Sequence, residues 1–233
     1  MPDIHLSPIG VIHSPFREKF GIPRQAGLIP AAKGHVALIG PWNQPDALRG
    51  IEDFSHLWLL WLARHHREGN WKTTVRPPRL GGNVRVGVFA SRSIFRPNAI
   101  GQSLVRLEKV IAAPGDCRLE VSGLDVLDGT PLLDIKPFLP WADAPADARG
   151  GFAAQPPKRR LAIAYTPEAE AAASSLPAGE RDLLEAAIAC DPRPAYHDDR
   201  RPYRLRISDY EAEFMVENHV AKVIRVAPTQ SPK

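Results

Sequence analysis

Two short segments hold most of the side chains that could do chemistry. The first, GVFASRSIFRPNAIG at Gly87–Gly101, places Arg92 and Arg96 beside Phe89 and Phe95. Guanidinium groups and rings on a loop can bind a carboxylate, a phosphate or a nucleobase. The structural alternative is a corner after a strand, with Phe95 buried and both arginines in solvent, since turns commonly collect proline and asparagine.

The second segment, LDVLDGTPLLDIKPF at Leu124–Phe138, carries Asp125, Asp128 and Asp134. Asp128-Gly129 is a dipeptide typical of a tight hairpin turn, which places these carboxylates close together. They could receive a ribose hydroxyl, an amino group or the positive sulfonium of S-adenosylmethionine. Asp128 alone is equally well explained as a turn residue. Only the joint occurrence of the two segments favours a site.

Motifs for the common alternatives are absent from the sequence. It contains no GxGxxG after a strand, no GxxxxGK[ST], no GxSxG, no HExxH and no Cys/His set with zinc spacing. The pair His65-His66 is expected to face opposite sides of a strand, so a shared metal is not expected.

Short β-rich segments separated by Gly, Pro and Asn dominate the first 140 residues and favour a β-barrel. The alternation in SLVRLEKVI, 103–111, is imperfect, so a short helix is an alternative there. The predicted strands are 4–13, 35–39, 54–63, 85–91, 103–111, 118–124 and 131–137.

The remaining chain predicts a second, smaller unit. Residues 141–158 are rich in Ala, Pro, Gly and Asp and read as a loop. A strand at 161–165, a helical stretch at 168–190 that Pro177 must interrupt, and strands at 203–207, 211–216 and 220–226 follow. The fold class is therefore mainly β: a barrel domain at 1–145, a linker at 146–158 and a small α+β domain at 159–233.

The net charge of +4 arises entirely in the first 154 residues. Within them, the basic stripe contains eight Lys or Arg side chains against Glu68 alone. Such a stripe attracts a polyanion, because neutralised phosphates release counterions. A solvated face with counter-charges elsewhere is the alternative. The stripe comprises Arg64, Arg67, Lys72, Arg76, Arg79, Arg85, Arg92 and Arg96.

Composition also suggests a compartment. The two cysteines, Cys117 and Cys190, form no CxxC pair, and the N-terminus lacks the layout of a signal peptide. The longest apolar run, Phe54–Ala63, is far shorter than the roughly 20 residues of a spanning helix. We expect a cytoplasmic protein without a membrane span.

Taken together, GVFASRSIFRPNAIG, DGTPLLDIKPF, FSHLWLLW and RPPRLGGN resemble the TsaA-like family of tRNA N6-threonylcarbamoyladenosine methyltransferases. The similarity runs over nearly the whole chain and includes DPRPAY at 191–196. It implies a β-barrel that binds S-adenosylmethionine, a smaller C-terminal domain, a homodimer, and transfer of a methyl group to N6 of threonylcarbamoyladenosine beside the anticodon of tRNA.

The resemblance also carries cofactor contacts onto matching positions. These are Gln25, Ala26, Gly27, Leu28, Arg64, His65, Arg92, Leu104, Leu127, Asp128, Gly129 and Thr130.

We further expect Asp125 or Asp128 to orient or deprotonate the acceptor. Arg92 would anchor an anionic group of cofactor or substrate, and Arg96 with Asn98 would address the modified nucleotide.

Three positions depart from the family pattern: Ala99 stands where a proline is common, Phe138 where a tyrosine is usual and Ser91 where threonine is common. Ala99 is expected to loosen its loop. Two other functions fit the same residues. One is a non-catalytic RNA-binding barrel that stacks a base on Phe95. The other is a sensor that binds S-adenosylmethionine without turnover.

Overall fold

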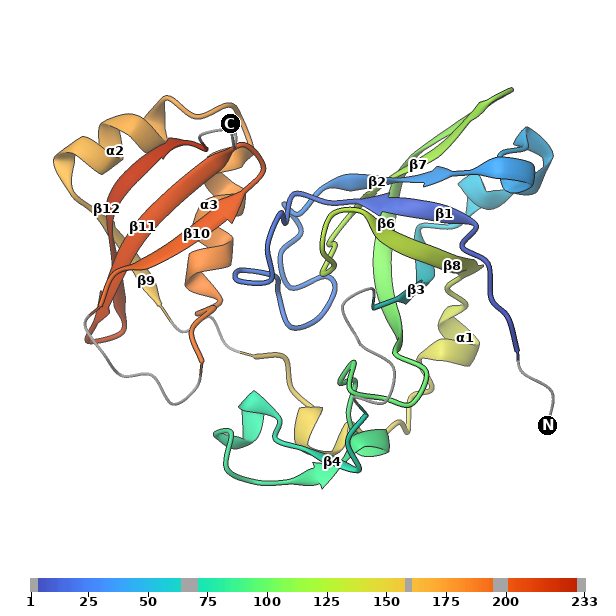
Figure 1. Cartoon of the computed structure of the whole chain (residues 1–233), viewed down its shortest axis with the longest axis horizontal. Coiled ribbons are helices and arrows are strands. Elements are labelled where there is room, and N and C mark those ends of the chain that lie inside the picture. Colours follow the sequence, from blue (N-terminus) through green and yellow to red (C-terminus); the bar gives the residue numbers. More distant parts are fainter. Residues whose placement is uncertain (1–3, 64–70, 158–160, 195–200, 230–233) are drawn as a thin grey trace.

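A closed barrel and a separate four-stranded sheet form the two halves of the molecule (Figure 1). The computed structural model describes residues 4–63, 71–157, 161–194 and 201–229. The helix-poor, mainly β architecture confirms the fold class expected from the sequence. Among the described residues, no helix is long and apolar enough to cross a membrane.

Six antiparallel strands close the barrel in the order β1-β2-β7-β6-β3-β8. A closed barrel leaves none of these strands with an unpaired edge. Its interior is filled by alternate apolar residues such as Ile12, Leu57, Leu59, Val105 and Leu119, all of them fully buried. The strands are β1 (Gly10–His13), β2 (Gly34–Leu38), β3 (His56–Leu62), β6 (Ile100–Ala113), β7 (Asp116–Ser122) and β8 (Thr130–Pro137).

Several sequence-based expectations for this half were wrong in detail. The first strand begins only at Gly10. Of the strand expected at 85–91, only β5 (Val86–Gly87) forms, and a 3₁₀ turn at Val88–Ala90 follows it. The strand expected at 103–111 is confirmed as part of the longer β6, and only the alternative of a short helix there is wrong, because β3 and β7 pair with both edges of this strand.

The expected hairpin at Asp128-Gly129 is also absent, since β7 pairs with β2 and β6 whereas β8 pairs with β1 and β3. Gly129 does take a positive φ of 74°. The turn chemistry was correct, but the segments that flank the turn are not hydrogen-bonded neighbours.

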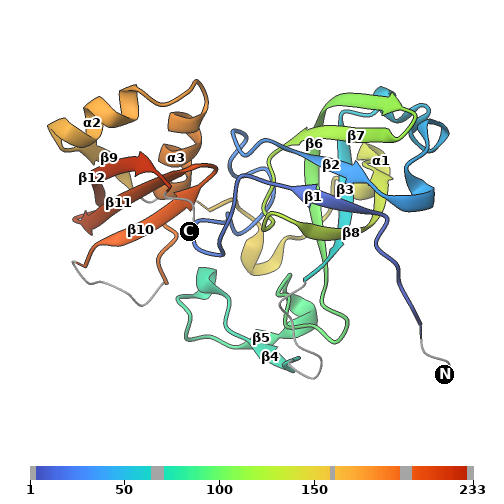
Figure 2. The same ribbon diagram turned by 45° about the horizontal axis from the view of Figure 1, so that its top comes forward.

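Three connections meet at one end of the barrel. In an antiparallel barrel, the ends of β1, β7 and β3 lie beside the starts of β2, β8 and β6, as the registers show. The connections are 14–33, 63–99 and 123–129. The second contains β4 (Thr74–Val75), which pairs with β5 in a small lobe away from the barrel (Figure 2).

The C-terminal half is a sheet in the order β10-β11-β12-β9 with two helices. Thr166 accepts a hydrogen bond from Ala169 N (3.3 Å) and caps the first helix, and the break at Pro177 separates the two helices as expected. Strand β9 pairs with β12 in parallel. The elements are α1 (Pro140–Asp143), before this half, then β9 (Ala162–Tyr165), α2 (Pro167–Ser174), α3 (Glu180–Ala189), β10 (Tyr203–Ile207), β11 (Tyr210–Glu217) and β12 (Val220–Pro228).

The apolar residues form two cores, and the β1–β2 connection takes part in the second. Phe16, Ile29 and Ala32 are fully buried, yet they belong to the cluster of the C-terminal sheet and helices rather than to the barrel cluster. This connection reaches from the barrel to β10 and α3 in both views (Figures 1 and 2).

Candidate functional site

Asp125 lies at the centre of the end of the barrel where the three connections meet. Its neighbours Leu124 and Val126 are buried in the barrel core and fix the backbone on both sides of it. Ser103 Oγ donates a hydrogen bond to Asp125 Oδ1, and Trp61 Nε1 donates to Ser103 Oγ (2.9 Å). A chain from β3 through β6 thus orients the carboxylate.

Burial raises the pKa of Asp125 to about 6. Hydrogen bonds from Ser103 and from the backbone of Ala26, together with the positive charge of Arg92, act in the opposite direction and keep the rise from being larger. A carboxyl group with such a pKa is mostly ionised at neutral pH and can accept a proton.

Gln25 and Arg92 bring two of the three connections together next to Asp125. Arg92 Nη1 donates to Gln25 Oε1 (2.7 Å), and Gly27 N donates to the Gly123 carbonyl (2.8 Å). Arg92 is exposed and forms no ion pair with a carboxylate of any described residue. Its charge is therefore available to an anionic ligand.

Asp128 has a different environment. Its carboxylate accepts hydrogen bonds from Ser14 N (3.0 Å) and Arg17 Nη1 (2.6 Å), and His13 Nδ1 lies 3.5 Å away. Its backbone N donates to Phe16 O (2.8 Å). These contacts tie the β7–β8 connection to the end of β1, so the present partners of Asp128 are structural.

Arg96 is fixed against its own loop. Its Nη1 donates to Ser91 O (2.6 Å) and Val88 O (3.2 Å), and its guanidinium lies 5.6 Å from the Phe89 ring centroid. The exposed Asn98 and this pair line one hollow. Phe89 is 74% exposed and Phe95 only 37%, with Lys72 Nζ 4.8 Å from the Phe95 ring. Phe89 is therefore the more exposed of the two rings.

Ala99 takes a left-handed backbone conformation in this loop. Its φ is 47°, it is buried, and its carbonyl accepts a hydrogen bond from Ala63 N (3.1 Å). Proline cannot adopt a positive φ, so the loop with alanine takes a backbone conformation that a proline here would exclude.

The other cofactor contacts expected from the family resemblance lie in different parts of the structure. Leu127, Gly129 and Thr130 lie in or next to the β7–β8 connection, where Thr130 Oγ1 donates to Leu127 O (2.6 Å). Leu104 alternates with the buried Ser103 along β6 and so faces the opposite side of the sheet. Arg64 and His65 lie outside the described residues.

Two residues of the site were missed by the sequence analysis: Trp61 and Ser103. Both lie on the inward face of their strands, two positions away from the core residues Leu59 and Val105 respectively. This alternation was visible in the sequence, but a polar pair at the end of a barrel becomes apparent only when the strand register is known.

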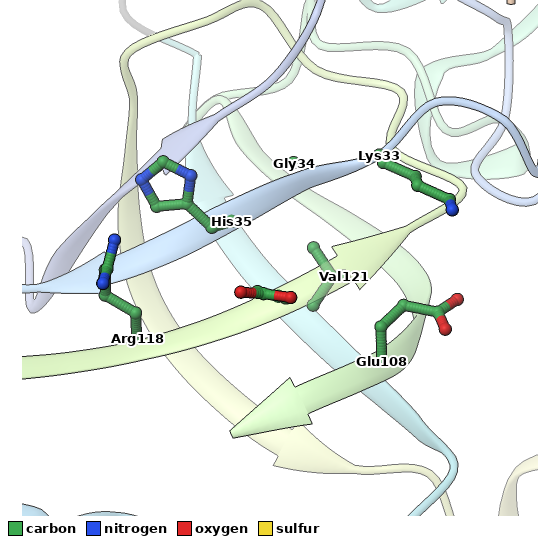
Figure 3. Close-up of a pocket in the computed structure, with 7 residues that line it drawn as sticks. Lys33, Gly34, His35, Glu108, Arg118 and Val121 are labelled. Carbon is green, nitrogen blue, oxygen red and sulfur yellow. The ribbon is translucent and has the colours of Figure 1, made fainter. Parts of the chain in front are cut away.

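A second hollow lies on the outer face of β2, β7 and β6, away from these residues. Figure 3 shows His35 and Arg118 at one end of it and Lys33 and Glu108 at the other. Burial, with the nearby charges of His13 and Arg118, lowers the pKa of His35. Glu108 and Glu120 balance the two cationic side chains, so this hollow does not single out a ligand. The described residues contain no group of His, Cys, Asp and Glu able to hold a metal ion.

Comparison with known families identifies both halves. Residues 11–144 match the tRNA-methyltransferase O N-terminal domain, and residues 158–229 match the TrmO C-terminal domain. The chain belongs to the tRNA-methyltransferase O family.

Individual relatives agree over nearly the whole length. The chain is 43% identical to the Escherichia coli K12 tRNA (adenine(37)-N6)-methyltransferase, with 98% of this chain and 100% of the relative covered. It is 48% identical to Pseudomonas aeruginosa RcsF, provisionally named an S-adenosylmethionine-dependent methyltransferase, over 90% of this chain and 91% of that protein. A crystal structure of TrmO from Pseudomonas aeruginosa superimposes with a TM-score of 0.77 at 40% identity and covers 97% and 99% of the two chains.

Family membership confirms the expectation of an S-adenosylmethionine-dependent tRNA methyltransferase.

Proposed function

We propose that this chain transfers a methyl group from S-adenosylmethionine to N6 of the threonylcarbamoyladenosine next to the tRNA anticodon. The observation that carries the proposal is the meeting of Gln25–Gly27, Arg92 and Asp125 at one end of the barrel. The three connections bring a guanidinium, an amide side chain and a carboxylate into one region, and a charged nucleoside cofactor can be bound by such groups.

The residues present fit that cofactor. S-adenosylmethionine supplies a methyl group activated by a positively charged sulfur. Arg92 forms no ion pair with a described carboxylate, so its guanidinium can pair with the carboxylate of the cofactor. The position that a Cβ of Gly27 would occupy is empty within 4 Å. A flat ligand can therefore approach the backbone of Gln25–Leu28 closely.

The acceptor needs help because its nitrogen belongs to a urea-like group with a delocalised lone pair. Removing its proton makes it a good nucleophile: the N–C bond would form as the proton passes to a base and the methyl–sulfur bond breaks, with a neutral thioether as the leaving group. Asp125 is the carboxylate that we assign to this proton, since the raised pKa leaves it basic at neutral pH and its partner Ser103 holds it in place. Asp128 already holds Ser14 and Arg17, so we assign it to positioning.

The 63–99 connection provides a surface for the RNA. Among the six described side chains of the basic stripe, none forms an ion pair with a described carboxylate; these are Lys72, Arg76, Arg79, Arg85, Arg92 and Arg96. The hollow beside them, about 340 Å³, is lined by Phe89, Arg96, Pro97, Asn98 and Ile100. We propose that it receives the modified nucleotide, with Arg96 and Asn98 as polar contacts and Phe89 as the stacking ring.

We further propose a cytoplasmic homodimer and the division 1–145, 146–158 and 159–233. The family matches at 11–144 and 158–229 support the division. Apolar side chains exposed on the barrel half outside that hollow, among them Ile39, Trp42 and Trp141, provide surface for a second copy.

One experiment tests the proposed reaction. The purified chain is incubated with S-adenosylmethionine labelled in its methyl group and with tRNA that either carries or lacks threonylcarbamoyladenosine. We expect label in the modified tRNA only. Binding of tRNA without transfer would instead support a non-catalytic RNA-binding barrel. Binding of S-adenosylmethionine without transfer to either tRNA would support a sensor.

A further inference from the structure

The β1–β2 connection, residues 14–33, is shared between the two halves of the molecule. It contains no helix or strand, and it carries Gln25–Leu28. A segment of this length without secondary structure has many conformations available unless other elements fix it. Its contacts therefore decide how well these four residues are preorganised.

The barrel fixes the connection at its ends and at one central point. Ser14 Oγ donates to Val126 O (2.6 Å), and Leu124 N donates to Ala32 O (3.1 Å). In the middle, only the backbone of Ala26 and Gly27 contacts the 123–125 segment, through the bonds to Asp125 and Gly123 described above.

The C-terminal domain fixes the stretch between these points. The rings of Phe20 and Tyr203 stack with centroids 6.1 Å apart and an interplanar angle of 6°. A Cβ on Gly21 would lie 2.1 Å from Leu205 Cδ1, which shows how closely the backbone packs on β10.

Three hydrogen bonds add to this packing. Ser208 N donates to Pro15 O (2.7 Å), Arg206 N to Glu18 Oε1 (3.3 Å) and Arg24 Nη2 to the Arg193 carbonyl (3.3 Å).

We propose that Phe20 and Tyr203 are positioning residues for the methyl donor: by holding 14–24 on β10, the C-terminal domain sets the conformation of Gln25–Leu28. The inference rests on the proposed function, in which Gln25–Leu28 contact S-adenosylmethionine. Arg24 is bonded to the C-terminal domain, and the next residue, Gln25, is bonded to Arg92. Loosening the stack therefore weakens cofactor binding without removing a group that touches the cofactor.

The test compares variants on opposite edges of the C-terminal sheet. Phe20→Leu and Tyr203→Leu remove the stack next to the connection, whereas Tyr165→Leu removes an aromatic residue from β9, the far edge strand. For each variant we measure the Kd for S-adenosylmethionine by calorimetry. The KM for S-adenosylmethionine and the kcat are measured with modified tRNA as the acceptor. We expect Kd and KM to rise at least fivefold for the first two, with kcat at saturating cofactor within twofold of wild type. Tyr165→Leu should lower the Tm but leave Kd unchanged, and Tyr203→Phe, which keeps the ring, should restore wild-type Kd.

Each outcome separates the inference from the function on which it rests. If wild type binds and transfers while Gln25→Ala weakens binding, but Phe20→Leu and Tyr203→Leu keep the wild-type Kd, the positioning role is wrong and the proposed function stands. An equal rise in Kd for Tyr165→Leu also overturns the positioning role, because it would reflect general loss of stability. If wild type neither binds nor transfers, both proposals fail.

A measurement on the wild-type chain covers the case in which the leucine variants do not fold. Because coupling is reciprocal, saturating S-adenosylmethionine should slow amide hydrogen exchange in β10 and leave β9 unchanged. Protection of Ala26 and Gly27 without any change in β10 would contradict the proposal.

Discussion

Two aspartates three positions apart illustrate how environment assigns roles to identical side chains. Asp125 is held between buried residues by a neutral hydroxyl and a backbone N–H, whereas Asp128 is bonded to a guanidinium and a backbone N–H at the end of β1. The first environment raises a carboxyl pKa because it penalises the charged form. The two residues can therefore be separated experimentally by their pH dependence.

Asp125→Asn should stabilise the protein at neutral pH. The folded-state pKa of about 6 lies above the ordinary value of 3.8, so ionisation lowers the stability of the folded chain as pH rises between these values. Above pH 6 the full loss of stability has occurred in wild type. Because asparagine does not ionise, the free energy of unfolding of the variant should exceed that of wild type by roughly 1–3 kcal/mol at neutral pH. The free energy of unfolding from urea titrations at pH 4 and pH 7.5 should show a gain only at pH 7.5. A gain of equal size at both pH values would contradict the argument.

The rate of methyl transfer should depend on the same ionisation. If Asp125 accepts the proton, wild-type kcat rises with pH and levels off above about 6, since only the ionised form is active. Asp125→Asn should be slower by a factor of about 100 and lack this limb. Superimposable pH–rate profiles for wild type and variant would exclude Asp125 as the proton acceptor.

Arg92→Ala should abolish detectable methyl transfer and leave the fold intact. The side chain is exposed, and within the described part of the chain its side-chain hydrogen-bond partner is Gln25, so its removal leaves no buried group unpaired. Arg49→Ala, at an exposed arginine outside the basic stripe, is the control and should keep most of the kcat. Activity is measured as label transferred to tRNA and folding by circular dichroism; wild-type turnover by Arg92→Ala would contradict the role.

At the scale of elements, the three connections at one end of the barrel carry the residues of the candidate site, and the strands hold the connections in place. Asp128 shows how they are linked, because its carboxylate and its backbone N both bind the Ser14–Arg17 stretch that follows β1. The β7–β8 connection is thereby fixed to the start of the β1–β2 connection. Loss of this link should lower the free energy of unfolding and leave the pH dependence of the rate unchanged.

Asp128→Asn is accordingly expected to lower the free energy of unfolding by about 1–2 kcal/mol, because the amide keeps one acceptor but loses the charge that pairs with Arg17. Asp134→Asn, at a more exposed carboxylate paired with Lys136, is the matched control and should change stability by less than about 0.5 kcal/mol. The shape of the pH–rate profile should stay that of wild type. A changed acidic limb in Asp128→Asn would transfer the proton-accepting role to this residue.

Much of the element structure could be predicted from the sequence, and its failures have physical causes. Periodicity located β2, β3, β8 and the C-terminal strands, and Pro177 correctly divided the helices, because these signals are local. The hairpin at Asp128-Gly129 was wrong because a turn dipeptide fixes a backbone angle, whereas strand pairing depends on partners far along the chain. For the same reason, sequence could select Asp125 but not its partners Trp61 and Ser103. The positive φ of Ala99 had no signal, since alanine rarely adopts it.

At the scale of the whole molecule, the positive charge is unevenly placed. The described part of the basic stripe lies in the 63–99 connection, which projects from the barrel as the lobe around β4 and β5 (Figure 2). The strand registers show that this connection leaves the barrel at the same end as the 123–129 connection, which carries Asp125. An anionic RNA would thus be drawn toward the reacting end rather than toward the opposite end, where Arg49 pairs with Asp46.

Salt dependence should reveal this asymmetry. Each phosphate contact contributes about one unit to the slope of log Kd for tRNA against log salt concentration. Arg76→Ala should reduce that slope by about one, whereas Arg49→Ala, at the opposite end of the barrel, should leave it unchanged. Filter binding at salt concentrations from about 50 to about 200 mM is a suitable measurement, because slopes of this size can be resolved over that range. Equal slopes for wild type and both variants would remove Arg76 from the RNA surface.

The shared β1–β2 connection also has a consequence for biosynthesis. Phe16, Ile29 and Ala32 leave the ribosome early, but the strand on which their segment packs, β10, begins only at Tyr203. While the intervening chain is being made, at about 5–20 residues per second, these apolar side chains have no native cover. The barrel can close before β10 has been synthesised. The nascent chain nevertheless exposes the apolar side chains of the β1–β2 connection for roughly ten seconds or more. The nascent chain is therefore prone to aggregate from the synthesis of the β1–β2 connection until the last three strands, β10, β11 and β12, are complete.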